Sequence, residues 1–178
     1  MPGTDSVERI GVLTGGGDCP GINAVIRAVV KTGLLDYGLE AVGILDGFEG
    51  LVTNKMIELD YEDVSGILTL GGTILGTSNS AHPFEYVPAG EEDREPEDRS
   101  DDCLRHFEKA GLDVLFCIGG DGTLSIAHRL AAKGIPVVGV PKTIDNDIVG
   151  TDVTFGFDTA VQIVAEALDR LHTTAMSH

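Results

Sequence analysis

Two carboxylates, Asp145 and Asp147, stand two residues apart in the segment 141–147, which is rich in groups that form hydrogen bonds. If this segment is extended, both side chains point the same way, because alternate residues of an extended chain share a face. Such a pair suits a general base and a partner that orients a hydroxyl group. An Asx-turn is the alternative use of this spacing. Lys142 and Thr143 could contact a phosphoryl group during transfer, although a lysine taken alone is more commonly just solvated.

Two glycine-rich stretches, Gly15–Gly17 and Gly119–Thr123, each stand before a predicted helix. Glycine lets the backbone approach a ligand and present its N–H groups, and a helix N-terminus favours phosphate. Tight structural turns are the alternative, and neither stretch has the Lys-Ser or Lys-Thr pair of a Walker A loop. Asp121 lies between two glycines, where it would repel phosphate unless a divalent cation such as Mg²⁺ joined them. Its alternative role is to cap the helix that follows.

These residues together indicate phosphoryl transfer. They supply backbone cradles for phosphate, an aspartate for a metal, an aspartate for a base and a nearby cation. This reaction depends mainly on positioning and on the stabilisation of charge. The surrounding elements must therefore bring the residues to one place.

Short β-branched runs alternate with amphipathic runs, which predicts βαβ units and a parallel sheet covered on both faces. Polar or glycine-rich segments follow three of the predicted strands, and ligands of open parallel sheets bind beyond the carboxyl ends of strands. Val64–Leu70 is predicted to form a short helix before a glycine-rich loop. The predicted strands are 9–14, 40–45, 113–118 and 135–140, and the other predicted helices follow apolar stripes at 22–30, 101–110, 124–131 and 161–171.

The composition limits the possible partners. The chain has 178 residues, 24 of them glycine, and a formal net charge of −17 from 29 acidic and 12 basic residues. This excess of acid disfavours nucleic-acid binding. The spacing of Cys19, Cys103 and Cys117 fits neither a disulfide framework nor a zinc site, so we expect a reduced, cytoplasmic compartment. We also expect no signal peptide and no membrane span. The acidic segment 91–102 is predicted to be a solvated loop or helix lead-in, with a regulatory role as the alternative.

Five segments resemble the phosphofructokinase family in their order and spacing, over Arg9–His178. They are TGGGDCPGINAVIR, GGTILGT, CIGGDGT, VPKTIDND and GTDVTFGFDTAV. GGDGT also occurs in NAD kinases and diacylglycerol kinases, whereas PKTIDND after it is highly specific. The resemblance implies a Rossmann-like parallel-sheet sandwich, the first domain of the two-domain fold. Residues 1–178 would be the donor-binding domain of a cytoplasmic, homotetrameric 6-phosphofructokinase of glycolysis, and the second, sugar-phosphate domain is absent from this chain.

The same resemblance implies roles for individual residues. Asp145 would be the base that takes the proton from the 1-hydroxyl of fructose 6-phosphate, Lys142 would assist catalysis, and Asp121 would hold Mg²⁺. Asn79 and Ser80 stand where the family places an arginine or a similar base that helps to hold donor phosphates. The donor would contact Gly17, Asn79, Ser80, Gly120, Asp121, Gly122 and Thr123, and the sugar phosphate would contact Thr143, Ile144, Asp145 and Asp147.

The predicted donor is ATP. Members that use pyrophosphate commonly carry an aspartate at the position of Gly122, where it repels the α-phosphate of a nucleotide, and glycine leaves room for ATP. Those members also commonly carry a lysine at the position of Lys142, so a pyrophosphate-dependent enzyme is the alternative. A non-catalytic module that binds nucleotide or phosphate is a second alternative, because family chains continue into a further domain.

Other residues are expected to have lesser roles. Cys19 is predicted to fill space rather than to act as a nucleophile. Phe48 either packs on the nucleotide, as the resemblance implies, or belongs to the core. Arg27 and Lys31 keep the basic character of the family's effector site, but His172 replaces an arginine, so we expect effector control to be absent or altered.

Overall fold

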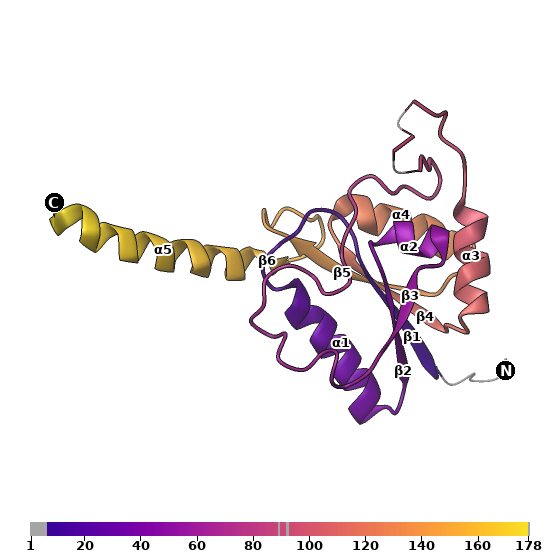
Figure 1. The fold of residues 1–178 in the computed structure, drawn as a ribbon, viewed down its shortest axis with the longest axis horizontal. Helices are drawn as coiled ribbons and strands as arrows, with labels where there is room; N and C mark the ends of the chain where they lie inside the picture. Colours follow the sequence, from indigo (N-terminus) through magenta and orange to yellow (C-terminus); the bar gives the residue numbers. More distant parts are fainter. Residues whose placement is uncertain (1–6, 89, 92, 178) are drawn as a thin grey trace.

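The computed structural model describes residues 7–88, 90–91 and 93–177. These residues form a six-stranded sheet in the order β3-β2-β1-β4-β5-β6 (Figure 1). All neighbouring strands are parallel except β2 and β3, so the predicted α/β class with a mainly parallel sheet is confirmed. The strands are β1 (Arg9–Thr14), β2 (Glu40–Ile44), β3 (Met56–Leu59), β4 (Val114–Gly119), β5 (Val137–Thr143) and β6 (Phe155–Gly156).

Helices pack on both faces of the sheet. The stripe predicted for the first helix is confirmed, because its apolar members Ile22, Val25 and Ile26 are buried in the core beneath α1. A second core lies on the opposite face, where α2, α3 and α4 contribute side chains such as Leu51, Phe107 and Leu130. The helices are α1 (Ile22–Asp36), α2 (Phe48–Thr53), α3 (Ser100–Lys109), α4 (Asp121–Ala132) and α5 (Phe157–Ser177).

One local prediction is wrong, and the bounds of one predicted strand are shifted. Val64–Leu70 forms turns instead of a helix. Its apolar residues Val64 and Ile67 are buried nevertheless, in the core beneath α1, and Gly66 has a φ of 77° between them, which a right-handed helix does not accommodate. The strand predicted at 135–140 is confirmed with shifted bounds, because β5 begins at Val137, continues to Thr143 and pairs with β6. The strand thereby carries Lys142 and Thr143, which had been expected in a loop.

The acidic segment 91–102 leads into α3, and ion pairs hold much of it in place. Arg94 pairs with Glu91 and Glu97, and Arg99 pairs with Glu97 and Asp102. Glu92 lies outside the described residues. The two arginines thus offset part of the repulsion within the segment.

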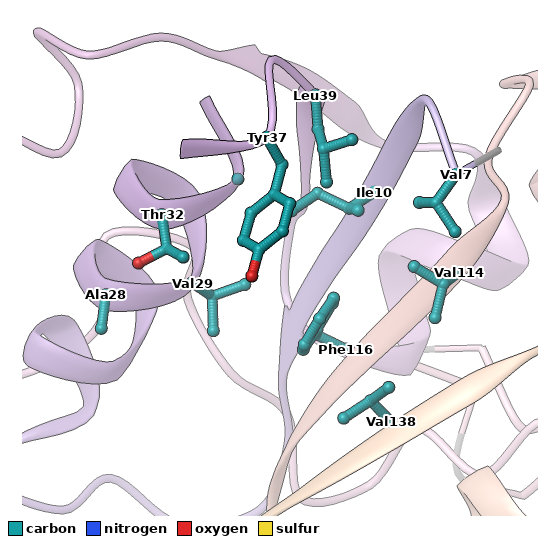
Figure 2. A pocket seen from close by; sticks show the side chains of 11 residues that line it. Val7, Ile10, Ala28, Val29, Thr32, Tyr37, Leu39, Val114, Phe116 and Val138 are labelled. Atoms are coloured by element: carbon teal, nitrogen blue, oxygen red, sulfur yellow. The ribbon is translucent and has the colours of Figure 1, made fainter. Parts of the chain in front are cut away.

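The prediction that both faces of the sheet are covered is confirmed by the two cores, but one part of the sheet is left open. An apolar groove of about 570 Å³ lies between α1 and the strands β4 and β5 (Figure 2). Phe116 and Val138 point into it from the sheet, and Val138 is 41% exposed. Nor does α5 fill this groove, because it runs away from the sheet (Figure 1) and leaves apolar side chains such as Leu168 and Leu171 exposed. Within the described residues, no helix has the length and apolar composition needed to cross a membrane.

Candidate active site

Three segments from different parts of the chain meet at the carboxyl end of the sheet and enclose a cavity of about 270 Å³. They are the turn between β1 and α1, the turn between β4 and α4, and the end of β5 with the residues that follow it. A cavity at this edge is where open parallel sheets bind ligands. Its lining residues are Gly16, Gly17, Asp18, Cys19, Gly120, Gly122, Thr123, Lys142, Thr143, Ile144 and Asp145.

The two glycine-rich turns are packed against each other through one side chain. Thr123 is buried in the space left by two residues that lack a Cβ. A Cβ on Gly15 would lie 2.6 Å from Thr123 Oγ1, and a Cβ on Gly119 would also collide with this side chain. The Gly15 N–H donates a hydrogen bond to the carbonyl of Ile118 in β4 (2.9 Å). These glycines are therefore required for close packing of the turns.

The second turn opens directly into α4. Gly120 occupies the cap position, and no side-chain hydrogen bond caps the helix, so the alternative role of Asp121 as the helix cap is wrong. The first N–H groups of a helix have no partner within it and carry the positive end of its dipole. Gly120, Gly122 and Thr123 line the cavity at this helix end. The arrangement can bind a phosphate through backbone N–H groups, as the sequence predicts.

Lys142 is buried beneath the third side of the cavity, with 4% of its surface exposed. Its ammonium group donates a hydrogen bond to the carbonyl oxygen of Gly17 (2.5 Å), and this bond ties β5 to the first turn. Burial lowers the pKa of Lys142, and the nearby Cys19 and Asp18 partly offset that effect. The lysine is therefore a buried donor within the site and is not a solvated surface residue.

The segment after β5 is not extended, so the geometry assumed for Asp145 and Asp147 does not hold. Asn146 lies between them with a φ of 53°, which breaks the alternation of side chains. Its Oδ1 accepts hydrogen bonds from the N–H and hydroxyl of Thr154 (2.9 and 3.2 Å). Asp145 lines the cavity, as do Thr143 and Ile144, whereas Asp147 is exposed and lies outside the lining.

A loop between β3 and α3 borders the first turn. The Thr77 hydroxyl donates to the carbonyl of Gly16 (2.5 Å), and the Gly16 N–H donates to the carbonyl of Ser78 (3.3 Å). Asn79 and Ser80 follow directly, but both are exposed and neither lines the cavity. The structure thus brings their loop to the site without placing these two side chains in it.

The carboxylates of the site suit a metal that arrives with its ligand. In the part of the chain that the structure describes, no group of three His, Cys, Asp or Glu side chains could hold a metal ion. Asp121 is exposed at the N-terminus of α4 and does not itself line the cavity, although its neighbours Gly120 and Gly122 do. Mg²⁺ is usually bound by one or two carboxylates together with substrate phosphates, so one aspartate fits this cation when phosphate is also present.

Two expectations on individual side chains are settled by burial. Cys19 is buried, a Cβ on Gly156 would collide with its sulfur, and burial raises the pKa of its thiol. It fills space, as predicted. Phe48 is 3% exposed in the core beneath α2 and α3, so it belongs to the core and does not face the cavity.

Sequence reasoning missed several residues that shape the site. Asp18 lines the cavity, and Asn146, Thr154 and Thr77 fix the backbone around it. These polar residues lie within the quoted motifs, which were the available signal. Their partners were not predictable, because each bond joins residues of two different motifs.

Comparison with known proteins gives a consistent result. The Phosphofructokinase family profile matches residues 9–178. ATP-dependent 6-phosphofructokinase 2 of Clostridium perfringens is 54% identical over 173 residues, which cover 97% of this chain and 47% of that protein. ATP-dependent 6-phosphofructokinase 3 of Streptomyces coelicolor is 54% identical over 170 residues, which cover 96% of this chain and 47% of that protein. The chain spans about half the length of these curated relatives.

Solved structures show the same fold. Phosphofructokinase from Pichia pastoris in the T-state matches with a TM-score of 0.74 and 31% identity, over 88% of this chain and 17% of that chain. A pyrophosphate-dependent phosphofructokinase from Marinobacter aquaeolei matches with a TM-score of 0.69 over 85% of this chain and 37% of that chain, but at 19% identity this likeness shows the fold alone. From the extent of the profile match and these relatives, the chain belongs to the phosphofructokinase family.

Proposed function

We propose that this chain is the donor-binding half of an ATP-dependent 6-phosphofructokinase, which transfers the γ-phosphoryl group of ATP to the 1-hydroxyl of fructose 6-phosphate in glycolysis. The observation that carries this proposal is the single cavity in which two glycine-rich turns meet Lys142 and Asp145. The names of the relatives support ATP as the donor. Because the chain spans half their length, a second half would complete the sugar site, in a cytoplasmic homotetramer.

At the donor end, the phosphates would lie between Gly17 and the first turn of α4. Free backbone N–H groups and the helix dipole favour negative charge there. Asp121 would hold Mg²⁺ against the donor phosphates, and the bound cation would supply neutralisation of the charge that develops on them. The Lys142 ammonium group adds a fixed positive charge beneath the cavity. These groups stabilise charge without moving during the reaction, which is the most effective arrangement for this chemistry.

At the acceptor end, Asp145 would take the proton from the attacking hydroxyl. It is the carboxylate of its segment that lines the cavity, and its backbone N–H donates to the hydroxyl of Thr143 (3.2 Å). Thr143, Ile144 and Asp147 would contact the sugar phosphate. A general base placed in this way contributes about 10²–10⁴-fold to a rate.

The choice of donor depends on the space at Gly122. A Cβ at this position would meet no atom within 4 Å, and the residue does not have a positive φ. The cavity is therefore open beside it, which favours a nucleotide with an α-phosphate. Pyrophosphate is the second candidate donor, because members that use it commonly carry a lysine at the position of Lys142. The charge of Lys142 alone would attract either donor.

A coupled assay with ATP and fructose 6-phosphate tests the proposal. The protein to use is a chimera in which this chain replaces the matching amino-terminal half of the Clostridium perfringens relative. We expect turnover by the chimera and none by the 178-residue chain alone. A soluble, folded chimera that binds ATP without turnover would instead support the alternative of a non-catalytic binding module.

A further inference from the structure

Asn23, in the first turn of α1, is a buried polar residue outside the cavity lining. It is 2% exposed. Its side-chain N–H groups donate to the carbonyls of Leu70 (3.1 Å) and Gly71 (3.2 Å), and its Oδ1 accepts a hydrogen bond from the N–H of Ile74 (2.9 Å). One side chain thus holds a segment that lies about fifty residues further along the chain. These bonds satisfy the buried side chain of Asn23 and also connect α1 to three backbone groups of another segment.

The segment needs such a partner because it has no regular structure. The segment Leu70–Ser78 forms neither helix nor strand, so its backbone groups lack the partners that a helix or sheet would supply. An asparagine offers both a donor and an acceptor, and α1 provides a rigid mount for it. Asn23 therefore fixes both sides of the glycine pair that opens the segment.

The same segment is also hydrogen-bonded to the end of β1 and to the first glycine-rich turn. The Thr14 hydroxyl donates to the carbonyl of Gly76 (2.6 Å) and lies 3.0 Å from the hydroxyl of Thr73. Beyond it, both backbone groups of Gly16 are bonded to the segment, to the Thr77 hydroxyl and the Ser78 carbonyl. The segment Leu70–Ser78 is thus hydrogen-bonded to Asn23 near one end and to Thr14 and Gly16 near the other, and it connects Asn23 to the wall of the cavity.

The first turn requires this external support. Gly16 has a φ of 80°, and consecutive glycines have more conformational freedom than any other residues. A phosphate cradle works only when its N–H groups are already in place before the ligand binds. The glycines leave space for the donor, and the hydrogen bonds from the neighbouring segment restrict their freedom.

We propose that Asn23 is a positioning residue of the donor site, acting through the segment Leu70–Ser78 to fix the backbone of Gly16. The claim that Asn23 affects donor binding rests on the proposed function. The claim that Asn23 fixes the backbone of Gly16 does not depend on it. Removing one end of the series should therefore loosen the turn without removing any group that faces the cavity.

Amide hydrogen exchange on the 178-residue chain without ligand tests whether Asn23 fixes the backbone of Gly16. Asn23→Asp keeps the size of the side chain but turns a carboxylate toward two carbonyls, and Thr77→Val removes the hydroxyl that reaches Gly16. In both variants we expect the Gly16 amide to exchange about tenfold faster, in keeping with the loss of one hydrogen bond. Thr77→Ser, which retains the hydroxyl, should exchange like the unsubstituted chain, and the Leu115 amide within the sheet serves as the internal control.

Titration of the same proteins with MgATP tests the effect on the donor. We expect Asn23→Asp and Thr77→Val to bind MgATP about tenfold more weakly than Thr77→Ser. Unchanged exchange at Gly16 in Asn23→Asp overturns the proposal, and so does faster exchange with unchanged MgATP affinity. If the unsubstituted chain does not bind MgATP, the proposed function is contradicted, and the exchange result still decides whether Asn23 fixes Gly16. Should Asn23→Asp fail to fold, Asn23→Ala, which removes the bonds to Leu70, Gly71 and Ile74 without adding a charge, replaces it in both measurements.

Discussion

Asp145 is the residue on which the proposed chemistry most depends, because it is the carboxylate of its segment that reaches the cavity. In the chimera, we expect Asp145→Asn to lower kcat by about 10²–10⁴-fold while the KM for fructose 6-phosphate changes little. The amide keeps the shape of the side chain but cannot accept the proton. Steady-state kinetics in both substrates measure the two parameters separately.

Asp147 supplies the matched control, since it is exposed and outside the cavity lining. Asp147→Asn should act mainly on the KM for fructose 6-phosphate. If Asp147→Asn lowered kcat as far as Asp145→Asn does, the assignment of the base to Asp145 would be wrong.

Tyr86 anchors the acidic segment to the fold. Its backbone pairs with that of Glu97, and its hydroxyl donates to a carboxylate oxygen of Glu49 in α2 (2.9 Å). Burial, with this hydrogen bond and the charge of Glu49, raises the pKa of Tyr86 to about 12. A phenol with a raised pKa stabilises the fold only while it is protonated. This contribution is complete below pH 10 and is lost as the pH rises from 10 to about 12.

We therefore expect the stability of the chain to fall by about 2 to 3 kcal/mol more than that of Tyr86→Phe across this range. Urea unfolding at pH 8 to 12 measures the difference. Tyr37, which is 72% exposed, gives the control variant Tyr37→Phe. Parallel pH dependence of the free energy of unfolding in the unsubstituted chain and Tyr86→Phe would show that folding does not raise the pKa of Tyr86.

Elements were predicted correctly from the sequence where the residues in the apolar pattern are also the residues buried in the structure. The strand at 9–14 matches β1 in both bounds, and α1 buries the predicted stripe. Val64–Leu70 has enough apolar residues for a helix but packs as turns, because Gly66 and long-range bonds to Asn23 decide its backbone. Distant partners of this kind are invisible to a pattern that compares only neighbours.

The same limit applies to the site. The glycines before two predicted helices led to the prediction that both turns lie at one edge of the sheet. The structure brings both turns, Lys142 and Asp145 to the same cavity. The turn at Asn146 was not predictable, because it depends on Thr154 beyond the motif. The general location of the site was thus accessible from the sequence, and the orientation of its carboxylates was not.

At the scale of the whole molecule, α5 packs against the rest of the chain through very few side chains. Ala160 is its one buried residue in the described chain, and a helix without tertiary contacts is marginal in water. We expect trypsin to cleave after Arg170 in α5 well before it cleaves after Arg129 in α4, whose guanidinium lies 3.7 Å from the ring centre of Phe84. Mass spectrometry of a timed digest distinguishes the two sites. Equal resistance at both would mean that α5 is packed in solution.

The chain spans about half the length of the curated relatives it matches. The groove beside β5 and the apolar stripe of α5 are exposed in it. In the proposed function, the residues that recognise the donor lie within this chain, and this makes the choice of donor the feature to measure.

The most direct test is kcat/KM of the chimera for ATP and for pyrophosphate, each with fructose 6-phosphate, together with Gly122→Asp. The open space at Gly122 predicts a preference for ATP. It also predicts that Gly122→Asp lowers kcat/KM for ATP about tenfold or more, because a like charge would meet the α-phosphate, and leaves the use of pyrophosphate unimpaired. A strong preference of the chimera for pyrophosphate, or ATP use unaffected by Gly122→Asp, would contradict the account.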